Sequence, residues 1–203
     1  MSHFISSYCR IKNRAVYKNG DSILAVENTG KLEDALIKAY EELQINYPKF
    51  YKMDNLAKLG LLASEVVLKD RILKQEYQPE KVAVILSNAS SSLDTDLNYF
   101  ESTKKIASPA LFVYTLPNIV TGEICIRHGF KGENGFFIFE EFDAVFMADY
   151  VNQVLNQGSS ACLAGWVEVL GEQHNVFLYL AENNKQGLAL PHTTEQLEKL
   201  YRE

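Results

Sequence analysis

The residue run that most constrains the fold is Val82 to Leu86 (VAVIL), an uninterrupted apolar stretch rich in β-branched side chains. A strand that is covered on both faces reads as such a run, because neither face needs polar side chains. Pro79 and Glu80 end the polar stretch before it. The run therefore predicts a central strand with a layer of structure on each side, as in an α/β sandwich.

Two segments with helical spacing precede this strand. Residues 32–43 have apolar side chains every three to four positions, begin after Gly30 and end before Pro48. Residues 56–67 carry a wide apolar stripe, and Asp54 is a suitable N-cap for them. We expect both helices to lie on the sheet.

The segments after the central strand also alternate. Ser90 to Ser92, followed by Asp94 and Asp96, predict the start of a helix. Helical spacing of apolar residues also occurs in residues 122–127 and 142–155, and Gly158 predicts the left-handed end of the second of these helices. Thr193 or Thr194 begins a last short helix.

The remaining strands are expected in three regions of the chain. They are a hairpin region over residues 3–26 with a turn at 19–21, a buried strand at 136–139, and a C-terminal hairpin of residues 161–170 and 176–180. Together these elements predict one α/β domain over residues 1–203.

Composition excludes several classes of protein. The net charge of -6 and a pI near 5.3 argue against nucleic acid as a partner, because phosphates must be met by clustered cations. Cys9, Cys125 and Cys162 are too few and too scattered for a disulfide framework, which favours a reducing cytoplasm. We expect neither a signal peptide nor a membrane span, because apolar runs of the needed length do not occur.

Residues 108–134 (SPALFVYTLPNIVTGEICIRHGFKGEN) resemble the segment that precedes the nucleophile in β-ketoacyl synthases, the 3-oxoacyl-[acyl-carrier-protein] synthases of the thiolase-like superfamily. Residues 163–170 (LAGWVEVL) are similar to the family's Ala-Gly-Gly-Val-Glu strand, with Trp166 in place of the second glycine. The resemblance covers residues 52–170, and the first 50 or so residues match poorly. The matching positions of the first segment are Pro117, Asn118, Gly122, Gly129 and Gly132.

The resemblance implies a fold. It identifies the chain as similar to the N-terminal half of a ketosynthase, one of the two similar halves of the thiolase fold. The expected architecture is a mixed, mostly parallel five-stranded sheet flanked by helices, with a C-terminal hairpin. In the family the strand before the nucleophile lies at the dimer interface, which here corresponds to Phe136, Phe137, Ile138 and Phe139.

The resemblance also implies that the nucleophile is missing. Threading through the glycine-rich approach places Glu141 at the family's cysteine position, and counting back from Leu163 gives Glu140 instead. A carboxylate is a poor nucleophile toward thioesters, so condensation through it is not expected. An acidic first turn formed by Glu140, Glu141 and Asp143 is the simpler explanation. The two catalytic histidines belong to the family's second half, which is not in this chain.

Other sites find little support in the sequence. Cys125 and His128 have a spacing that could hold a metal, but a core thiol and a surface imidazole are the better interpretation, and we expect no metal and no cofactor. Adjacent carboxylates such as Glu140 and Glu141 cannot flank one glycosidic bond.

Three functions remain. The leading hypothesis is a non-catalytic ketosynthase-like subunit, comparable to a chain length factor, in fatty acid, polyketide or polyene biosynthesis, either as a homodimer or paired with a full-length ketosynthase. The second is a small acyl-thioester enzyme, decarboxylase-like, that uses Glu141 as a general base. The third is a binding module for acyl chains or acyl carrier protein, and a carrier protein is also a candidate partner of the first.

Overall fold

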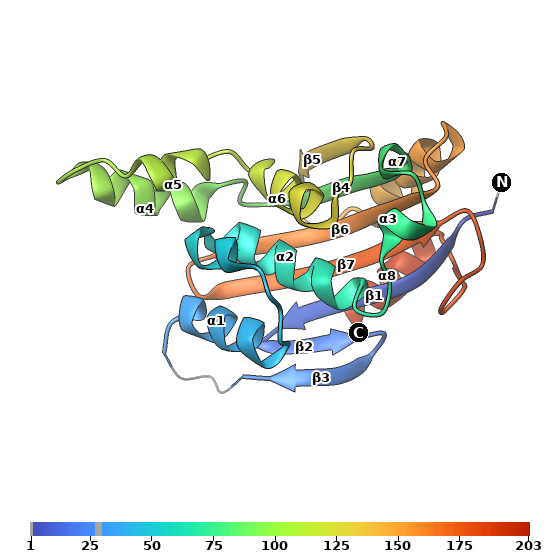
Figure 1. The fold of residues 1–203 in the computed structure, drawn as a ribbon, viewed down its shortest axis with the longest axis horizontal. Coiled ribbons are helices and arrows are strands. Elements are labelled where there is room, and N and C mark those ends of the chain that lie inside the picture. The colour runs from blue at the N-terminus through green and yellow to red at the C-terminus, as the bar shows by residue number, and fades with distance from the viewer. Residues whose placement is uncertain (1, 27–29) are drawn as a thin grey trace.

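The computed structural model describes residues 2–26 and 30–203, and one mixed sheet with helices on both faces makes up its body (Figure 1). The strands are β1 Phe4–Lys12, β2 Ala15–Lys18, β3 Asp21–Ala25, β4 Val82–Asn88, β5 Asn134–Ile138, β6 Ala161–Leu170, β7 Gln173–Glu182 and β8 Leu190–Pro191. The helices are α1 Leu32–Glu42, α2 Asn55–Val67, α3 Leu73–Glu76, α4 Leu93–Thr103, α5 Pro109–Val113, α6 Ile119–His128, α7 Ala144–Asn156 and α8 Thr194–Arg202, with 3-10 turns η1 Pro48–Lys52 and η2 Pro79–Lys81.

The sheet is larger and less parallel than the sequence predicts. Its described residues form eight strands in the order β3-β2-β1-β7-β6-β4-β5, with β8 paired to β1. Among the strands that the structure describes, only the β4–β5 and β4–β6 pairs are parallel. The expectation of five mostly parallel strands is wrong because the N-terminal strands do not stand apart: β1 pairs with β7 and extends the hairpin of β6 and β7.

The central strand is confirmed. All seven residues of β4 are buried, with β5 and β6 on its two sides. Val84 and Leu86 point to the face covered by α1, α2 and α6, whereas Ala83 and Ile85 pack with α7 and α8 on the other face. Because side chains alternate along a strand, one apolar run supplies both halves of the core.

The local signals at turns and caps are confirmed as well. Asp54 caps α2, and its Oδ1 accepts a hydrogen bond of 2.9 Å from the N–H of Ala57. Asn19 and Gly20 both have positive φ (55° and 92°) in the turn between β2 and β3, which suits a two-residue hairpin. Thr193 caps α8.

Two features of the periphery were not expected. Strand β5 was predicted to be buried, but it is the edge of the sheet, and its residues are half-buried or exposed. Helices α4 and α5 project beyond the end of the sheet as an arm (Figure 1), and α5 was not predicted at all. Among the described residues, no helix is long and apolar enough to cross a membrane.

Candidate site at the head of helix α7

The head of α7, residues 140–144, is where the ketosynthase resemblance places the nucleophile. Asp143 is the N-cap of α7, and its Oδ1 accepts a hydrogen bond of 2.8 Å from the N–H of Phe146. Glu140 and Glu141 are exposed and lie in the loop before the cap. The expectation that all three acids form the first turn is therefore wrong, because a carboxylate caps best from the N-cap position itself and only Asp143 occupies it.

An aromatic cluster, which we call the plug, closes the head of α7 from the inside. It consists of Phe142, Trp166, Phe177 and Tyr201. Phe142 is 8% exposed, and its ring stacks on Tyr201 at a centroid distance of 4.6 Å. The same ring meets the edges of Phe177 at 5.5 Å and of Trp166 at 6.4 Å. These rings fill the space next to the nucleophile position of the resemblance.

The plug draws its members from distant parts of the chain. Trp166 stands where the family has its second glycine, and it is 3% exposed. Tyr201 comes from α8, which packs beside α7 through the fully buried Leu197. The contact of Tyr201 has no signature in the sequence, because it depends on where α8 docks.

A buried cation lies against the plug. Arg10 of β1 is 5% exposed, and its guanidinium lies 4.7 Å from the ring centroid of Tyr201 and 5.6 Å from that of Phe177. Its Nε and Nη1 have no hydrogen-bond partner among the described residues. Burial lowers the pKa of Arg10 and raises the pKa of the Tyr201 phenol, to which the charge of Glu141 adds a further increase.

The three cysteines lie away from this site. Cys9 and Cys162 are fully buried in β1 and β6, and burial raises the pKa of both thiols. Burial also raises the pKa of Cys125, in α6, to about 11. A thiol with a raised pKa is a poor nucleophile at neutral pH, so none of the three stands in for the missing residue.

The histidine of the Cys125 and His128 pair is not the surface imidazole that the sequence suggests. The His128 ring stacks on Phe130 at 5.4 Å, and its Nε2 lies 3.0 Å from the Ser64 hydroxyl oxygen. Burial lowers the pKa of His128 to about 4. No group of three or more metal-ligating side chains occurs within residues 2–26 and 30–203.

The family-motif positions have structural roles that differ from one another. Gly129 ends α6 in the left-handed conformation, at φ 75°. Gly132 passes so close to β4 that an added Cβ would lie 2.4 Å from the carbonyl oxygen of Val82. Asn118 is the N-cap of α6 and follows Pro117, whereas a Cβ at Gly122 would meet no atom within 4 Å.

The second motif, residues 163–170, lies in β6 and contacts both β7 and the loop after β4. At Gly165 (φ 147°) an added Cβ would lie 1.9 Å from the carbonyl oxygen of Phe177, so only glycine fits. The Glu168 carboxylate accepts hydrogen bonds from the N–H groups of Ala89 at 2.7 Å and Ser90 at 3.1 Å. It thereby holds the loop that leads from β4 into the arm.

The predicted interface residues are brought together on the edge strand. Phe137 lies on the α7 face, 4.8 Å from the Phe146 ring and 6.3 Å from the Phe139 ring. Phe136 packs against the core on the opposite face. Ile138 is 48% exposed at the end of the strand. The edge therefore combines an unpaired backbone with accessible apolar side chains.

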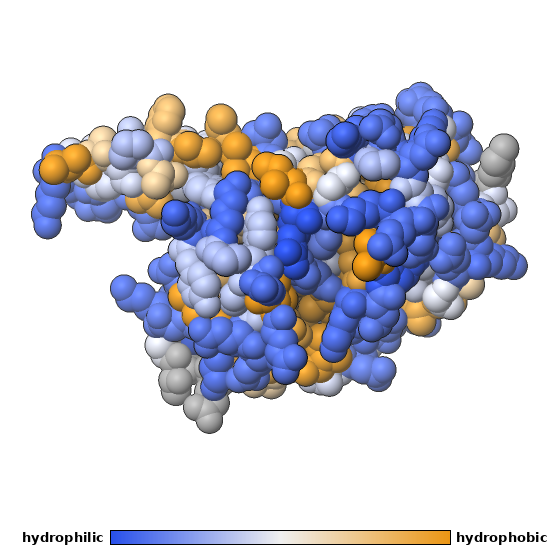
Figure 2. Space-filling model, in the orientation of Figure 1, coloured by the Kyte–Doolittle hydropathy of each residue, from blue (hydrophilic) through white to orange (hydrophobic). Residues whose placement is uncertain are grey.

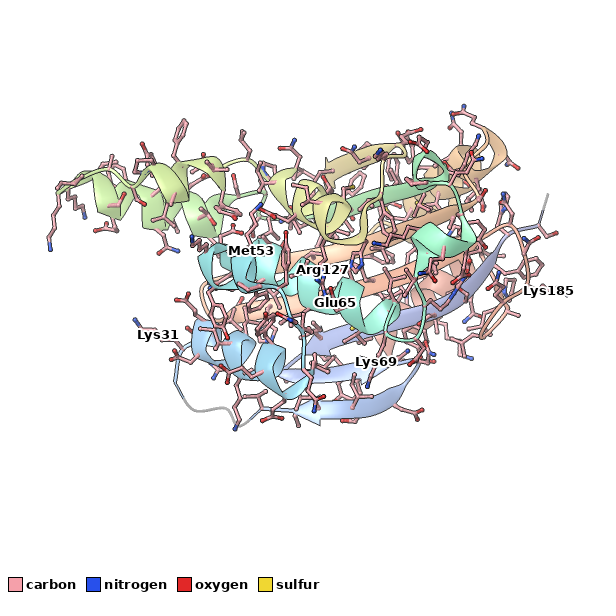
Figure 3. The ribbon with its side chains drawn as sticks, in the orientation of Figure 1. Lys31, Met53, Glu65, Lys69, Arg127 and Lys185 are labelled. Carbon is pink, nitrogen blue, oxygen red and sulfur yellow. The ribbon has the colours of Figure 1, made fainter. Side chains whose placement is uncertain are left out.

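The opposite face of the sheet carries two adjoining clefts that sequence reasoning missed, with volumes of about 310 and 340 Å³. Glu65 of α2 and Arg127 of α6 lie between the two clefts (Figure 3). They form an ion pair, with the Arg127 Nε 2.5 Å from the Glu65 Oε1. Lys69 lines both clefts. This charged lining does not resemble a tunnel for an acyl chain, and the clefts lie on the side away from α7.

The comparisons with known proteins connect this geometry to one fold. No family model matches the sequence, and no curated relative matches it. The ishigamide ketosynthase/chain length factor is similar in structure, with a TM-score of 0.68 and 17% identity over 94% of this chain and 64% of that chain. The chain thus spans less than two thirds of that relative. A β-ketoacyl synthase from Burkholderia phymatum gives a TM-score of 0.59 at 10% identity, over 90% of this chain and 59% of that chain.

Another similar structure is matched over most of its own length. The complex of the ketosynthase ApeO with its chain length factor ApeC from Xenorhabdus doucetiae contains a chain that matches with a TM-score of 0.57 and 12% identity, over 100% of this chain and 91% of that chain. The fold is therefore that of ketosynthases and chain length factors. The ketosynthase resemblance seen in the sequence is confirmed at the level of this fold.

Proposed function

We propose that the protein is a non-catalytic ketosynthase-like subunit, corresponding to the N-terminal half of the fold, that pairs with a catalytic ketosynthase in the manner of a chain length factor. The observation that carries this proposal is the plug. The resemblance places a reactive thiolate here, with open space for an acyl group. In this chain the Phe142 ring contacts the rings of Tyr201 and Trp166 at this place, and residues 139–144 contain no cysteine. Such a site has neither the nucleophile nor the room for a thioester.

The comparisons support the pairing. The relatives include a ketosynthase in complex with its chain length factor, and a type II polyketide synthase in which an acyl carrier protein is in complex with its ketosynthase. We propose β5 as the pairing edge, because it is the edge strand of the described sheet, paired only with β4, and Ile138 is exposed at its end. Fatty acid, polyketide or polyene biosynthesis is the proposed setting, with a carrier protein as a further partner. We place the subunit in the cytoplasm, which suits its free cysteines.

The test is co-purification. The chain is co-expressed with each ketosynthase of its source genome in turn, and the mass of the complex is measured by light scattering. We expect one ketosynthase to form a stable complex, and we expect no acyl group on this chain when intact-mass spectrometry follows incubation with acyl thioesters. A chain that stays monomeric and joins none of these enzymes would refute the proposal.

The same experiment separates the enzymatic alternative. Glu141 is exposed and outside the helix, so Glu141→Gln should leave folding, pairing and the activity of the complex unchanged. Loss of acyl-thioester turnover in this variant, with pairing intact, would instead support the decarboxylase-like enzyme.

A further inference from the structure

The two adjoining clefts on the α2 and α6 side of the sheet share the same charged side chains. Arg127, Glu65 and Lys69 each line both clefts. Their volumes of about 310 and 340 Å³ fall at the lower end of the roughly 300–1,000 Å³ of small-molecule sites. Strongly hydrophilic side chains gather over α2, α3 and the end of α6 in Figure 2. A polar ligand held at the junction of the clefts can extend into either of them.

The guanidinium of Arg127 is fixed at this junction from three sides. Its Nε donates to the Glu65 carboxylate, and its Nη1 donates to the carbonyl oxygen of Asn46 at 3.1 Å. The Tyr47 ring covers it, with 5.1 Å between the Cζ and the ring centroid. Within residues 2–26 and 30–203, the Nη2 of Arg127 makes no hydrogen bond. An arginine that is oriented in advance loses little entropy when such a remaining N–H group binds an anion.

Two lysines add charge that no acid of the described chain neutralises. Lys69 and Lys74 are exposed, and among the described residues neither forms an ion pair. The Lys74 side chain crosses the end of α6, where a Cβ at Gly129 would lie 3.7 Å from its Cδ. Arg71 also lines the cleft, but both of its terminal nitrogens are bound by Glu182, at 2.6 and 2.9 Å. The two ammonium groups are therefore the ones that can meet an anion.

The larger part of the remaining wall is apolar and aromatic. Phe130 and His128 line the first cleft, and their rings stack at a centroid distance of 5.4 Å. Ile72 lines the same cleft and is 52% exposed. Burial lowers the pKa of His128 to about 4, so its imidazole is neutral at pH 7 and adds no charge. A flat, partly apolar group fits beside these side chains.

We propose that the junction of the two clefts binds the phosphate of a small organic phosphate monoester of about nucleotide size. Arg127, Lys69 and Lys74 hold the phosphate, and the organic part lies along Ile72 and Phe130. A phosphate monoester carries about −1.5 to −2 charge at pH 7, which suits several cations around one point better than a carboxylate does. Glu65, the acid in the lining of both clefts, does not oppose the ligand, because Arg127 already meets its charge.

This inference goes beyond the proposed function and does not depend on it. The clefts lie on the face covered by α1, α2 and α6, whereas the plug lies on the face of α7 and α8. Pairing with a ketosynthase and binding of a phosphate can therefore be measured separately, and the failure of one leaves the other unaffected.

The experiment measures binding to the purified full chain by isothermal titration calorimetry at low ionic strength, where screening is weak. The probes are adenosine monophosphate, adenosine and inorganic phosphate. The double variant Lys69→Gln and Lys74→Gln removes both ammonium groups. The double variant Lys38→Gln and Lys199→Gln changes the net charge equally at exposed positions outside the clefts and is the matched control. Circular dichroism checks that all variants fold.

We expect wild type to bind adenosine monophosphate at least tenfold more tightly than it binds adenosine or inorganic phosphate. The Lys69 and Lys74 variant should bind the nucleotide at least tenfold more weakly than wild type, and the control variant within twofold of it. Equal weakening in both double variants would mean a general effect of surface charge and would overturn the inference. Absence of binding to wild type would mean that these cations only complement the C-termini of α2 and α6, which overturns it as well.

The comparison of the probes tests the class of ligand. Adenosine that binds as tightly as the nucleotide would overturn the assignment of a phosphate site, and inorganic phosphate that does so would overturn the organic part. Amide chemical shifts in NMR spectra locate the site: adenosine monophosphate should shift the signals of residues 68–74 and 127–130 and leave that of Phe142 unchanged. Shifts confined to other parts of the chain would contradict the proposed location.

Discussion

Replacing Phe142 by alanine is the sharpest test of the plug. The side chain is 8% exposed and makes three aromatic contacts, at centroid distances of 4.6, 5.5 and 6.4 Å. A buried Phe→Ala change costs about 3–5 kcal/mol, and because Phe142 lies in a loop that can partly relax we expect about 3 kcal/mol. The free energy of unfolding is measured by urea denaturation with circular dichroism.

The control is Val145→Ala on the first turn of α7, where the side chain is 56% exposed and the expected change is within about 0.5 kcal/mol. A double-mutant cycle of Phe142→Ala with Tyr201→Ala should show a coupling of about 1 kcal/mol, because the two rings stack directly. A loss below about 1 kcal/mol for Phe142→Ala, with no coupling to Tyr201, would mean that the head of α7 is not packed, and the argument against a catalytic pocket would fail.

Three further predictions concern buried titratable groups and glycines. Burial raises the pKa of Asp54 to about 6, so the native state binds the proton more tightly than the unfolded chain, and the free energy of unfolding of wild type falls as pH rises from about 4 to 6. The free energy of unfolding of Asp54→Asn, taken relative to wild type, should therefore be about 2 kcal/mol higher at pH 7.5 than at pH 4.5. An equal difference at both pH values would contradict this. Burial lowers the pKa of His128 to about 4, so stability is lost as pH falls from about 6.5 toward 4; His128→Gln should lose about 1–2 kcal/mol less than wild type between pH 7 and 5 in urea titrations. Gly165→Ala should prevent folding or cost more than about 4 kcal/mol, because its Cβ would meet the backbone of Phe177 at 1.9 Å, whereas Gly122→Ala in the interior of α6 meets nothing and should stabilise the protein by up to about 1 kcal/mol in thermal melts.

The sequence located most elements because their signals are local. Asp54 satisfies free N–H groups at the start of α2, and the Asn19–Gly20 turn adopts positive φ, so both features act within a few residues of chain. The continuous run in β4 reports burial on both faces directly. The ketosynthase resemblance, carried by motif glycines such as Gly132 and Gly165, depends on close backbone approaches that allow no other residue.

The sequence did not decide which strands are covered or which helices are left in water. The run of Phe136 to Phe139 looks like core in sequence, but no strand within residues 2–26 and 30–203 pairs with the outer side of β5. Leu93, Leu97 and Phe100 have the spacing of a core-facing helix, yet they are exposed. The spacing of apolar residues predicts which face of a helix or strand is apolar. Which element covers that face depends on how all the elements pack together.

The candidate site at the head of α7 was also predicted only in part from the sequence. By itself, the sequence determined that no cysteine stands near residues 139–144 and that tryptophan replaces a family glycine at position 166. Only the tertiary structure showed that Trp166, Phe142 and Tyr201 meet at the head of α7 and fill it. The reason is that α7 and the strands β6 and β7 separate Phe142 from Tyr201 in the chain, and their contact is set by how α8 packs beside α7, which no short stretch of sequence encodes.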